Sequence, residues 1–411
     1  MDQKNEIILL SINGTDRPGV TAALTEILAK NNAVILDIGQ ADIHSHLSLG
    51  ILFQSSEKDS GQTLKELLFK SNELNVNIRF NPITEEAYSE WVNMQGKHRH
   101  IITILGRKLT ARQIAAISGI VAEQGMNIDD IKRLTGRIPL EESERTPKAS
   151  VEFSVRGTPK DKEKMKADFM RLSPGLEMDI SFQEDSMFRR MRRLICFDMD
   201  STLIETEVID ELAVRAGVGD QVKAITESAM RGEIDFAESF RQRCALLKGL
   251  DVSVMQEIAE NLPITEGVDR LMSVLKKVGF KIAILSGGFT YFGNYLKNKY
   301  GIDYVYANEL EVIDGKLTGN YVGDIVDGKR KAELLRLIAQ VENVDIRQTV
   351  AVGDGANDLP MISIAGLGIA FHAKPKVKET AKQSISTIGL DGILYFLGYK
   401  DSYLEEQELF H

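Results

Sequence analysis

The stretch LICFDMDST at residues 194–202 decides the fold of the larger part of this chain. Four apolar residues predict a buried strand, and two aspartates, Asp198 and Asp200, stand just past its end. Farther along, the apolar runs KIAIL, TVAV and GLGIAF alternate with helical patterns. This alternation is typical of a mainly parallel sheet covered by helices on both faces. We therefore predict an α/β domain over residues 192–400.

Two segments interrupt that alternation. Residues from about 207 to 261 are helical in pattern and rich in polar residues, which predicts a helical cap inserted after the first strand. In the stretch EVIDGKLTG, the pair Asp314-Gly315 stands between two short strand patterns. This pair is typical of a tight β-hairpin turn.

The polar residues that follow the strands point to one site, because sites in open parallel sheets form at the carboxyl ends of the strands. The run KIAIL leads into Ser286 and Gly287, and TVAV leads into Asp354 and Asn357. Lys331 opens the helical pattern that precedes TVAV. Carboxylates, a hydroxyl group, glycines and a lysine are thus expected at one edge of the sheet.

This set of residues predicts metal-assisted phosphoryl chemistry. Carboxylates crowded at the end of a buried strand are costly unless they bind a cation, and Mg²⁺ prefers such oxygen ligands. We expect Mg²⁺ on Asp198, Asp200 and Asp354, attack on phosphorus by Asp198, and proton transfer by Asp200. Ser286, the backbone N–H groups around Gly287, Lys331 and Asn357 would hold the substrate. For Asp358, metal binding through water and orientation of Lys331 both remain open.

These motifs resemble those of the haloacid dehalogenase superfamily of phosphatases. DMDST, SGG, the lysine at Lys331 and GDGAND occur in the order typical of that superfamily, over about residues 192–400. The resemblance implies a Rossmann-like sheet and an aspartyl-phosphate intermediate on Asp198. It implies Mg²⁺ as the cofactor.

Within that superfamily, STLIETEVIDELA and AMRGEIDFAESFRQRCALL resemble the phosphoserine phosphatase family. The resemblance implies that Glu207 binds the substrate ammonium group and Arg243 its carboxylate. Met230 and Phe236 are expected to contact the substrate, although a plain role in the cap core is the alternative. The expected reaction hydrolyses O-phosphoserine to serine and phosphate, the last step of serine biosynthesis.

Two other functions remain to be weighed against this one. A phosphatase for phosphohomoserine or phosphothreonine would use Glu207 and Arg243 in the same way, so only the volume under the cap would discriminate. An amino-acid sensor with a vestigial catalytic half is the alternative from another class. The complete set of catalytic residue types argues against the sensor.

The N-terminal half contains an internal repeat. Residues 1–86 and 98–185 both show the order β-α-β-β-α-β, and their first halves align without gaps at an offset of 93. The matched pairs are Ala29 with Ala122, Ile35 with Ile128, Asp37 with Asp130, and Ile38 with Ile131. Residues 88–98 are expected to form the linker between the copies, and residues 137–148 a loop within the second copy.

These α+β units resemble ACT domains, which often bind amino acids and pair edge to edge. The candidate effector site combines Asn13, Gly14, Asp16 and Gly19 of the first copy with Asn127 of the second. Around residues 106–112 the second copy departs from the turn that carries this resemblance. Serine is the expected effector, and the alternative is that the modules only dimerise.

Composition limits the remaining possibilities. A length of 411 residues predicts two or three domains, and a net charge of −10 argues against nucleic acid or an anionic membrane as partner. Two cysteines without metal-like spacing fit a reducing compartment. The N-terminal sequence MDQKNEIILL predicts no signal peptide, and no apolar run has the length of a bilayer span. We expect a cytoplasmic homodimer.

Overall fold

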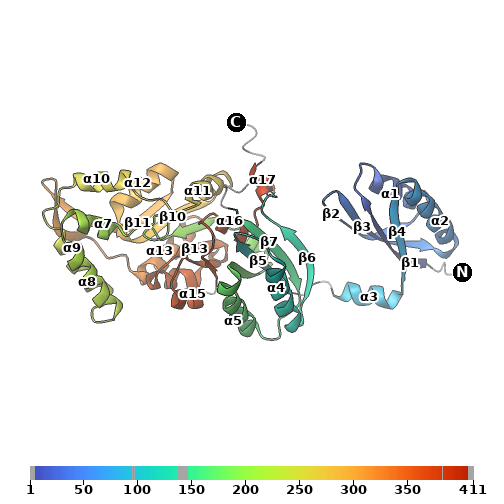
Figure 1. The fold of residues 1–411 in the computed structure, drawn as a ribbon, viewed down its shortest axis with the longest axis horizontal. Helices are drawn as coiled ribbons and strands as arrows, with labels where there is room; N and C mark the ends of the chain where they lie inside the picture. Colours follow the sequence, from blue (N-terminus) through green and yellow to red (C-terminus); the bar gives the residue numbers. More distant parts are fainter. Residues whose placement is uncertain (1–4, 95, 97, 138–146, 382, 406–411) are drawn as a thin grey trace. The chain divides into compact units, whose positions relative to one another are not determined.

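The structure is a computed structural model that describes residues 5–94, 96, 98–137, 147–381 and 383–405, and it divides the chain into two compact units (Figure 1). The first unit is Met1–Lys97 and the second is His98–His411. The first holds one copy of the repeat. The second holds the other copy together with the α/β domain, so these two parts fold against each other.

The first module has the predicted β-α-β-β-α-β order. Its elements are β1 (Asn5–Thr15), α1 (Val20–Lys30), β2 (Val34–Ile43), β3 (His46–Ser56), α2 (Glu57–Glu73) and β4 (Val76–Ile83). The strands form an antiparallel sheet in the order β2-β3-β1-β4. Alternate residues of β1, such as Leu10 and Ile12, are fully buried under the two helices, as the period of two predicts.

The predicted linker at residues 88–98 is partly helical, which the sequence interpretation did not specify. Helix α3 (Glu85–Asn93) begins after Thr84, whose side chain accepts a hydrogen bond from the backbone N–H of Ala87. This cap, with Glu85 and Glu86 in the first turn, stabilises a helix start. The linker interpretation overlooked that signal.

The second module repeats the same order. Its elements are β5 (Arg99–Gly106), α4 (Ala111–Glu123), β6 (Asn127–Arg133), β7 (Ala149–Arg156), α5 (Lys162–Leu172), the short turn η1 (Pro174–Leu176) and β8 (Met178–Glu184). The sheet order is β6-β7-β5-β8. Most of the loop predicted at residues 137–148 lies outside the described residues.

The second module packs against the α/β domain through apolar and charged contacts. Leu105 and Leu134 belong to the same buried cluster as the core of that domain. The guanidinium group of Arg107 donates to both carboxylate oxygens of Glu266, at 3.0 and 2.7 Å. The fully buried Asp391 accepts hydrogen bonds from Lys148 of the module and from Arg270. These contacts explain why the module and the domain form one unit.

The α/β domain is built on a seven-stranded sheet. Its strands are β9 (Leu194–Phe197), β10 (Lys281–Phe289), β11 (Tyr304–Ile313), β12 (Lys316–Val322), β13 (Thr349–Gly353), β14 (Leu367–Phe371) and β15 (Ser384–Ile385). The order is β12-β11-β10-β9-β13-β14-β15, and only β12 runs antiparallel to its neighbour. The mainly parallel sheet is confirmed, and so is the hairpin at Asp314-Gly315, where both residues have positive φ.

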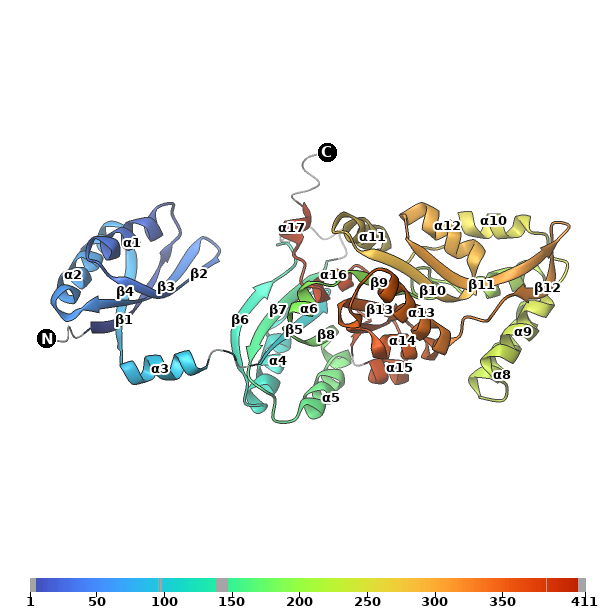
Figure 2. The ribbon, with the colours of Figure 1, turned by 180° about the vertical axis from the view of Figure 1, so that it is seen from behind.

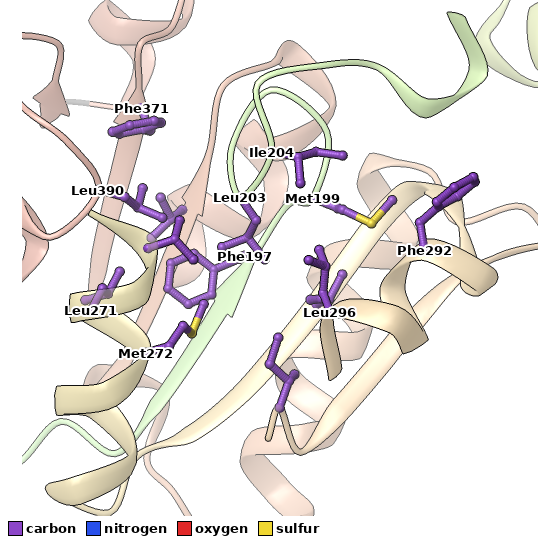
Figure 3. Packing of buried hydrophobic residues seen from close by; sticks show 14 of the residues in the cluster. Phe197, Met199, Leu203, Ile204, Leu271, Met272, Phe292, Leu296, Phe371 and Leu390 are labelled. Carbon is purple, nitrogen blue, oxygen red and sulfur yellow. The ribbon is translucent and has the colours of Figure 1, made fainter. Parts of the chain in front are cut away.

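Helices cover both faces of this sheet. On one face lie α11 (Val268–Lys277), α12 (Thr290–Tyr300) and α16 (Gly392–Phe396), and on the other α13 (Gly328–Val341), α14 (Leu359–Ile364) and α15 (Pro375–Ala381). The short helices α6 (Met187–Arg190) and α17 (Asp401–Glu405) contact the second module, where Arg189 pairs with Glu152 and the N–H of Asp401 donates to the carbonyl of Leu134. Phe197 of the central strand lies among Leu271 and Met272 of α11, and α12 contributes Phe292 and Leu296 to the same core (Figure 3). This core holds β9 in place, and with it the aspartates at its end.

The predicted cap is helical. It contains α7 (Val208–Arg215), α8 (Gly219–Met230), α9 (Phe236–Leu246) and α10 (Ser253–Glu260). The chain enters and leaves the cap side by side, because Ile204 pairs with Ile264 and the N–H of Glu205 donates to the carbonyl of Pro263 at 2.9 Å. In both ribbon views, α8 and α9 lie at the end of the second unit opposite the second module (Figure 1, Figure 2).

None of the described helices has the length and apolar character that crossing a membrane requires.

Candidate active site

Asp198 stands at the carboxyl end of the central strand. Its backbone N–H donates to the carbonyl of Val352 on β13 at 2.9 Å, which extends the sheet pairing to the aspartate itself. Its Oδ1 accepts hydrogen bonds from the N–H of Met199 at 2.8 Å and pairs with Lys331 Nζ at 3.0 Å. Because no described donor contacts Oδ2, that oxygen is available to attack.

Lys331 is a fully buried lysine between two carboxylates. Its Nζ lies 3.0 Å from Asp198 Oδ1 and 2.7 Å from Asp358 Oδ1. Burial disfavours the ammonium form, but the two carboxylates outweigh it and raise the pKa of Lys331. The lysine therefore carries a fixed positive charge beside Asp198. Among the alternatives for Asp358, orientation of Lys331 matches this contact.

Three carboxylates form a compact cluster. One oxygen each from Asp198, Asp354 and Asp358 lies within 4.8 Å of the others. Burial, followed by the charge of Asp198, raises the pKa of Asp354 to about 8 and that of Asp358 to about 7. Anionic oxygens this close repel one another unless a cation or protons neutralise them, so the donor set fits a hard divalent cation.

Asp200 is not part of this cluster, although the sequence analysis expected it among the metal ligands. It is buried, and its Oδ1 accepts a hydrogen bond from the N–H of Val208 at 3.4 Å. Burial, together with the charges of Glu207 and Asp198, raises the pKa of Asp200 well above its ordinary value. A raised pKa lets a carboxyl group keep its proton to higher pH, which suits it to donate that proton to a leaving group.

The loop after β10 approaches Asp200 from the other side. Ser286 is fully buried, and its Oγ accepts a hydrogen bond from the N–H of Gly288 at 3.0 Å. A Cβ atom at Gly288 would lie 2.8 Å from Asp200 Oδ2, so only glycine lets this backbone come so close. A Cβ atom at Gly287 would lie 3.3 Å from the ring of Phe236, which brings the cap to this loop.

Sequence reasoning missed Asn308, which joins two loops of the site. It lies on β11, is 2% exposed, and donates from Nδ2 to the carbonyl of Gly287 at 2.8 Å. Its Oδ1 accepts from the N–H of Val326 at 2.8 Å. The available signal was a polar amide inside the strand pattern YVYANELEV, beside the strand that carries SGG. A buried amide in such a place has hydrogen-bond partners, and here they come from the site.

Glu207 and Arg243 lie on the cap side. Glu207 precedes α7, and its Oε1 accepts a hydrogen bond from Ser201 Oγ at 2.9 Å. Partial desolvation raises the pKa of Glu207, with a further contribution from Asp198 that opposes the lowering effect of Ser201. Burial lowers the pKa of Arg243, whereas attraction to Glu207 raises it. No ion pair joins the two among the described residues, so both charges can meet a ligand.

The structure gives fewer contacts for the other residues predicted to bind the substrate. Phe236 begins α9, and its ring centroid lies 6.3 Å from that of Phe240 in the cap core. The side chain of Met230 lies outside the described part of the structure. Asn357 is half-buried in η3 (Ala356–Asp358), the short turn after β13.

The predicted effector residues fall in two different units. Asn13 and Gly14 end β1, Asp16 lies exposed in the following turn, and Gly19 precedes α1 with a φ of 95°. Asn13 Oδ1 accepts a hydrogen bond from Ser48 Oγ at 2.9 Å. Asn127 begins β6 in the second unit. A joint site formed by these residues stays a prediction.

Comparison with known proteins identifies the family. Models described as ACT domain match residues 6–81 and 98–183, and one described as haloacid dehalogenase-like hydrolase matches residues 192–366. A phosphoserine phosphatase of Streptomyces coelicolor is 38% identical over 391 residues, covering 95% of this chain and 92% of that protein. The chain belongs to the phosphoserine phosphatase family.

Two further relatives of this family agree with that assignment. Phosphoserine phosphatase SerB2 of Mycobacterium tuberculosis is also 38% identical, with 95% of this chain and 93% of that protein covered. A solved structure of a probable phosphoserine phosphatase from Vibrio cholerae is similar with a TM-score of 0.57 and 34% identity, over 75% of this chain and 88% of that one. The predicted superfamily and the two ACT modules are therefore confirmed.

Proposed function

We propose that this chain hydrolyses O-phosphoserine to serine and inorganic phosphate in a Mg²⁺-dependent reaction. The observation that carries the proposal is the buried Lys331 ammonium group between Asp198 and Asp358, with the raised-pKa carboxyl of Asp200 nearby. This arrangement provides a nucleophile, a fixed positive charge and a proton donor within one site. Membership of the phosphoserine phosphatase family supports the same substrate.

In the proposed reaction, Asp198 Oδ2 attacks phosphorus and the bond from phosphorus to the seryl oxygen breaks. Asp200 gives its proton to that oxygen, and as a carboxylate it then takes a proton from the water that hydrolyses the aspartyl-phosphate. Lys331 and the N–H groups of the Ser286–Gly288 loop stabilise the phosphoryl oxygens. A Mg²⁺ ion held by Asp198 and Asp354, with Asp358 close by, would neutralise the charge between the carboxylates and the phosphate.

Recognition of the amino-acid headgroup is assigned to Glu207 and Arg243. A carboxylate and a planar guanidinium group suit the ammonium and carboxylate ends of a zwitterion. Phosphothreonine and phosphohomoserine carry the same headgroup and are the alternative substrates.

A phosphate-release assay over a panel of phosphomonoesters tests this proposal. O-phosphoserine should give the highest kcat/KM, above phosphothreonine, phosphohomoserine and phosphoethanolamine. Glu207→Gln should lower kcat/KM for phosphoserine by at least about tenfold, because a charge-assisted hydrogen bond is lost. Glu205→Gln is the matched control, since that exposed residue lies on the same connection. Equal activity on all four esters would contradict the proposed substrate.

The ACT modules are proposed to bind serine as a feedback effector in a cytoplasmic dimer. The exposed turn at Asp16, with Gly19 at the start of a helix, can accept a carboxylate at backbone N–H groups. Calorimetric titration of serine into the full chain, repeated with Asp16→Ala and Asn127→Ala, tests this. Binding that both substitutions leave unchanged would place the effector elsewhere.

A further inference from the structure

A cavity of about 310 Å³ lies between the second module and the α/β domain. One wall comes from α5, the turn after it and β8, and the other from α15 and residues 383–387. This volume is at the lower end of the range of ligand pockets, which suits a molecule the size of one amino acid. The active-site residues described above do not line it.

The module side of the cavity combines polar residues, Lys166, Ser173, Glu177 and Asp179, with an apolar patch. Phe169, Met170 and Phe182 belong to this patch, and the rings of Phe169 and Phe182 lie with their centroids 6.0 Å apart. Methionine adapts its shape to a ligand, and aromatic rings offer a large apolar surface. This patch favours a compact hydrocarbon group.

The opposite side offers donors that the protein leaves unused. Lys378 lines the cavity and makes no ion pair with any residue that the structure describes. Asp179, which also lines the cavity, attracts Lys378, but Asp179 Oδ2 already accepts three hydrogen bonds, from Ser386 and Thr387. Ser386 Oγ is buried and has no hydrogen-bond partner among the described residues. An ammonium group and a hydroxyl group without partners suit a carboxylate.

We propose that this cavity binds a small carboxylate with a branched apolar body. The carboxylate lies at Lys378 and Ser386, and the hydrocarbon part lies against Phe169, Met170 and Phe182. Such a ligand has two sources, a free aliphatic acid or an apolar amino acid. The exposed Glu177 on the rim would add an attraction for the ammonium group of the amino acid only.

Calorimetry on the full chain tests this with L-leucine, 4-methylpentanoate and 3-methylbutylamine, which share the hydrocarbon part. Both carboxylates should bind, and the amine should not. Lys378→Gln should weaken binding by at least about tenfold, because a charged partner is lost. Lys376→Gln, an exposed lysine of the same helix, is the matched control and should leave the affinity unchanged.

Binding measurements on Glu177→Gln distinguish the two ligand sources, an apolar amino acid and a free aliphatic acid. Weaker binding of leucine with unchanged binding of 4-methylpentanoate identifies an amino-acid site, and equal affinities of the two ligands identify a site for free acids. The proposal is overturned if neither carboxylate binds at millimolar concentration. It is also overturned if the amine binds as well as they do, or if Lys378→Gln binds like the unchanged protein.

Discussion

The two βαββαβ modules share one strand order but differ in what covers their sheets. In the first, Asn13 and Asn77 face each other across β1 and β4, and both are exposed to solvent. In the second, Leu105 and Asp179 face each other across β5 and β8, and both are buried. An apolar residue and an anchoring carboxylate thus stand where the first module has polar groups. The same fold becomes a separate unit in one case and part of the catalytic unit in the other.

The turn after the first strand of each module shows the same divergence. In the first module this turn carries exposed residues, including Asp16 and Arg17. In the second it carries Arg107, whose guanidinium group binds Glu266, two residues after the Ile264 pairing at the base of the cap. The departure of the second copy from the ACT turn pattern is therefore a docking contact. A duplicated module can keep its core while one loop takes on a new partner.

The largest effect is expected from the buried face of the second module. Leu105→Ala should lower the free energy of unfolding of the second unit by about 2–5 kcal/mol, because it removes a side chain from the shared core. Ser11→Ala, on the corresponding face of the first module, should change stability by less than about 0.5 kcal/mol.

Denaturant unfolding can follow the two units separately. The single tryptophan, Trp91, lies in α3 of the first unit, and loss of phosphatase activity reports the second. Similar losses of stability for the two substitutions would show that the second module does not use this face for docking.

Metal binding and pH should change the stability of the second unit but not of the first, because only the second holds an acidic cluster among the described residues. Without metal, the folded protein keeps protons on Asp354 and Asp358, because their pKa values are about 8 and about 7. The unfolded chain releases these protons at lower pH. Stability of the second unit should therefore fall as pH rises from about 5 to about 8.

A divalent cation needs the ionised carboxylates, so its affinity should rise over the same pH range. At about 100 times its Kd the cation should stabilise the second unit by about 2.7 kcal/mol. Calorimetric scans at several pH values, with chelator or with Mg²⁺, measure both effects. A cation effect that does not grow with pH, or one seen in the Trp91 transition, would contradict this assignment.

The smallest effect is expected at the docking turn. Arg107→Ala removes a bidentate contact between half-exposed partners and should cost the second unit no more than about 1 kcal/mol. Because Glu266 adjoins the base of the cap, KM for the substrate should also change. Arg17→Ala in the first module is the control and should leave both quantities unchanged. If the two variants have the same stability and the same KM, Arg107 does not contribute to the docking contact.

Much of this organisation was predictable, for reasons visible in particular residues. Apolar periodicity predicted the strands, and the spacing of DMDST, SGG and GDGAND brought Asp198, Ser286 and Asp354 to one edge of the sheet. Asn308 was missed because its role depends on which strand lies next to β10, and local sequence does not encode this neighbour. The burial of Leu105 was missed because the sequence pattern of an apolar residue on an outer face is the same whether or not another domain covers that face.

The central claim is that Asp198 carries the phosphoryl group during turnover. The protein is mixed with O-phosphoserine and Mg²⁺, quenched in acid within one turnover, digested and examined by mass spectrometry. The peptide containing Asp198 should be heavier by one phosphoryl group, and the modification should be absent from Asp198→Asn, whose phosphate release should fall by orders of magnitude. A phosphoryl group on another residue, or substantial turnover by Asp198→Asn, would contradict the account.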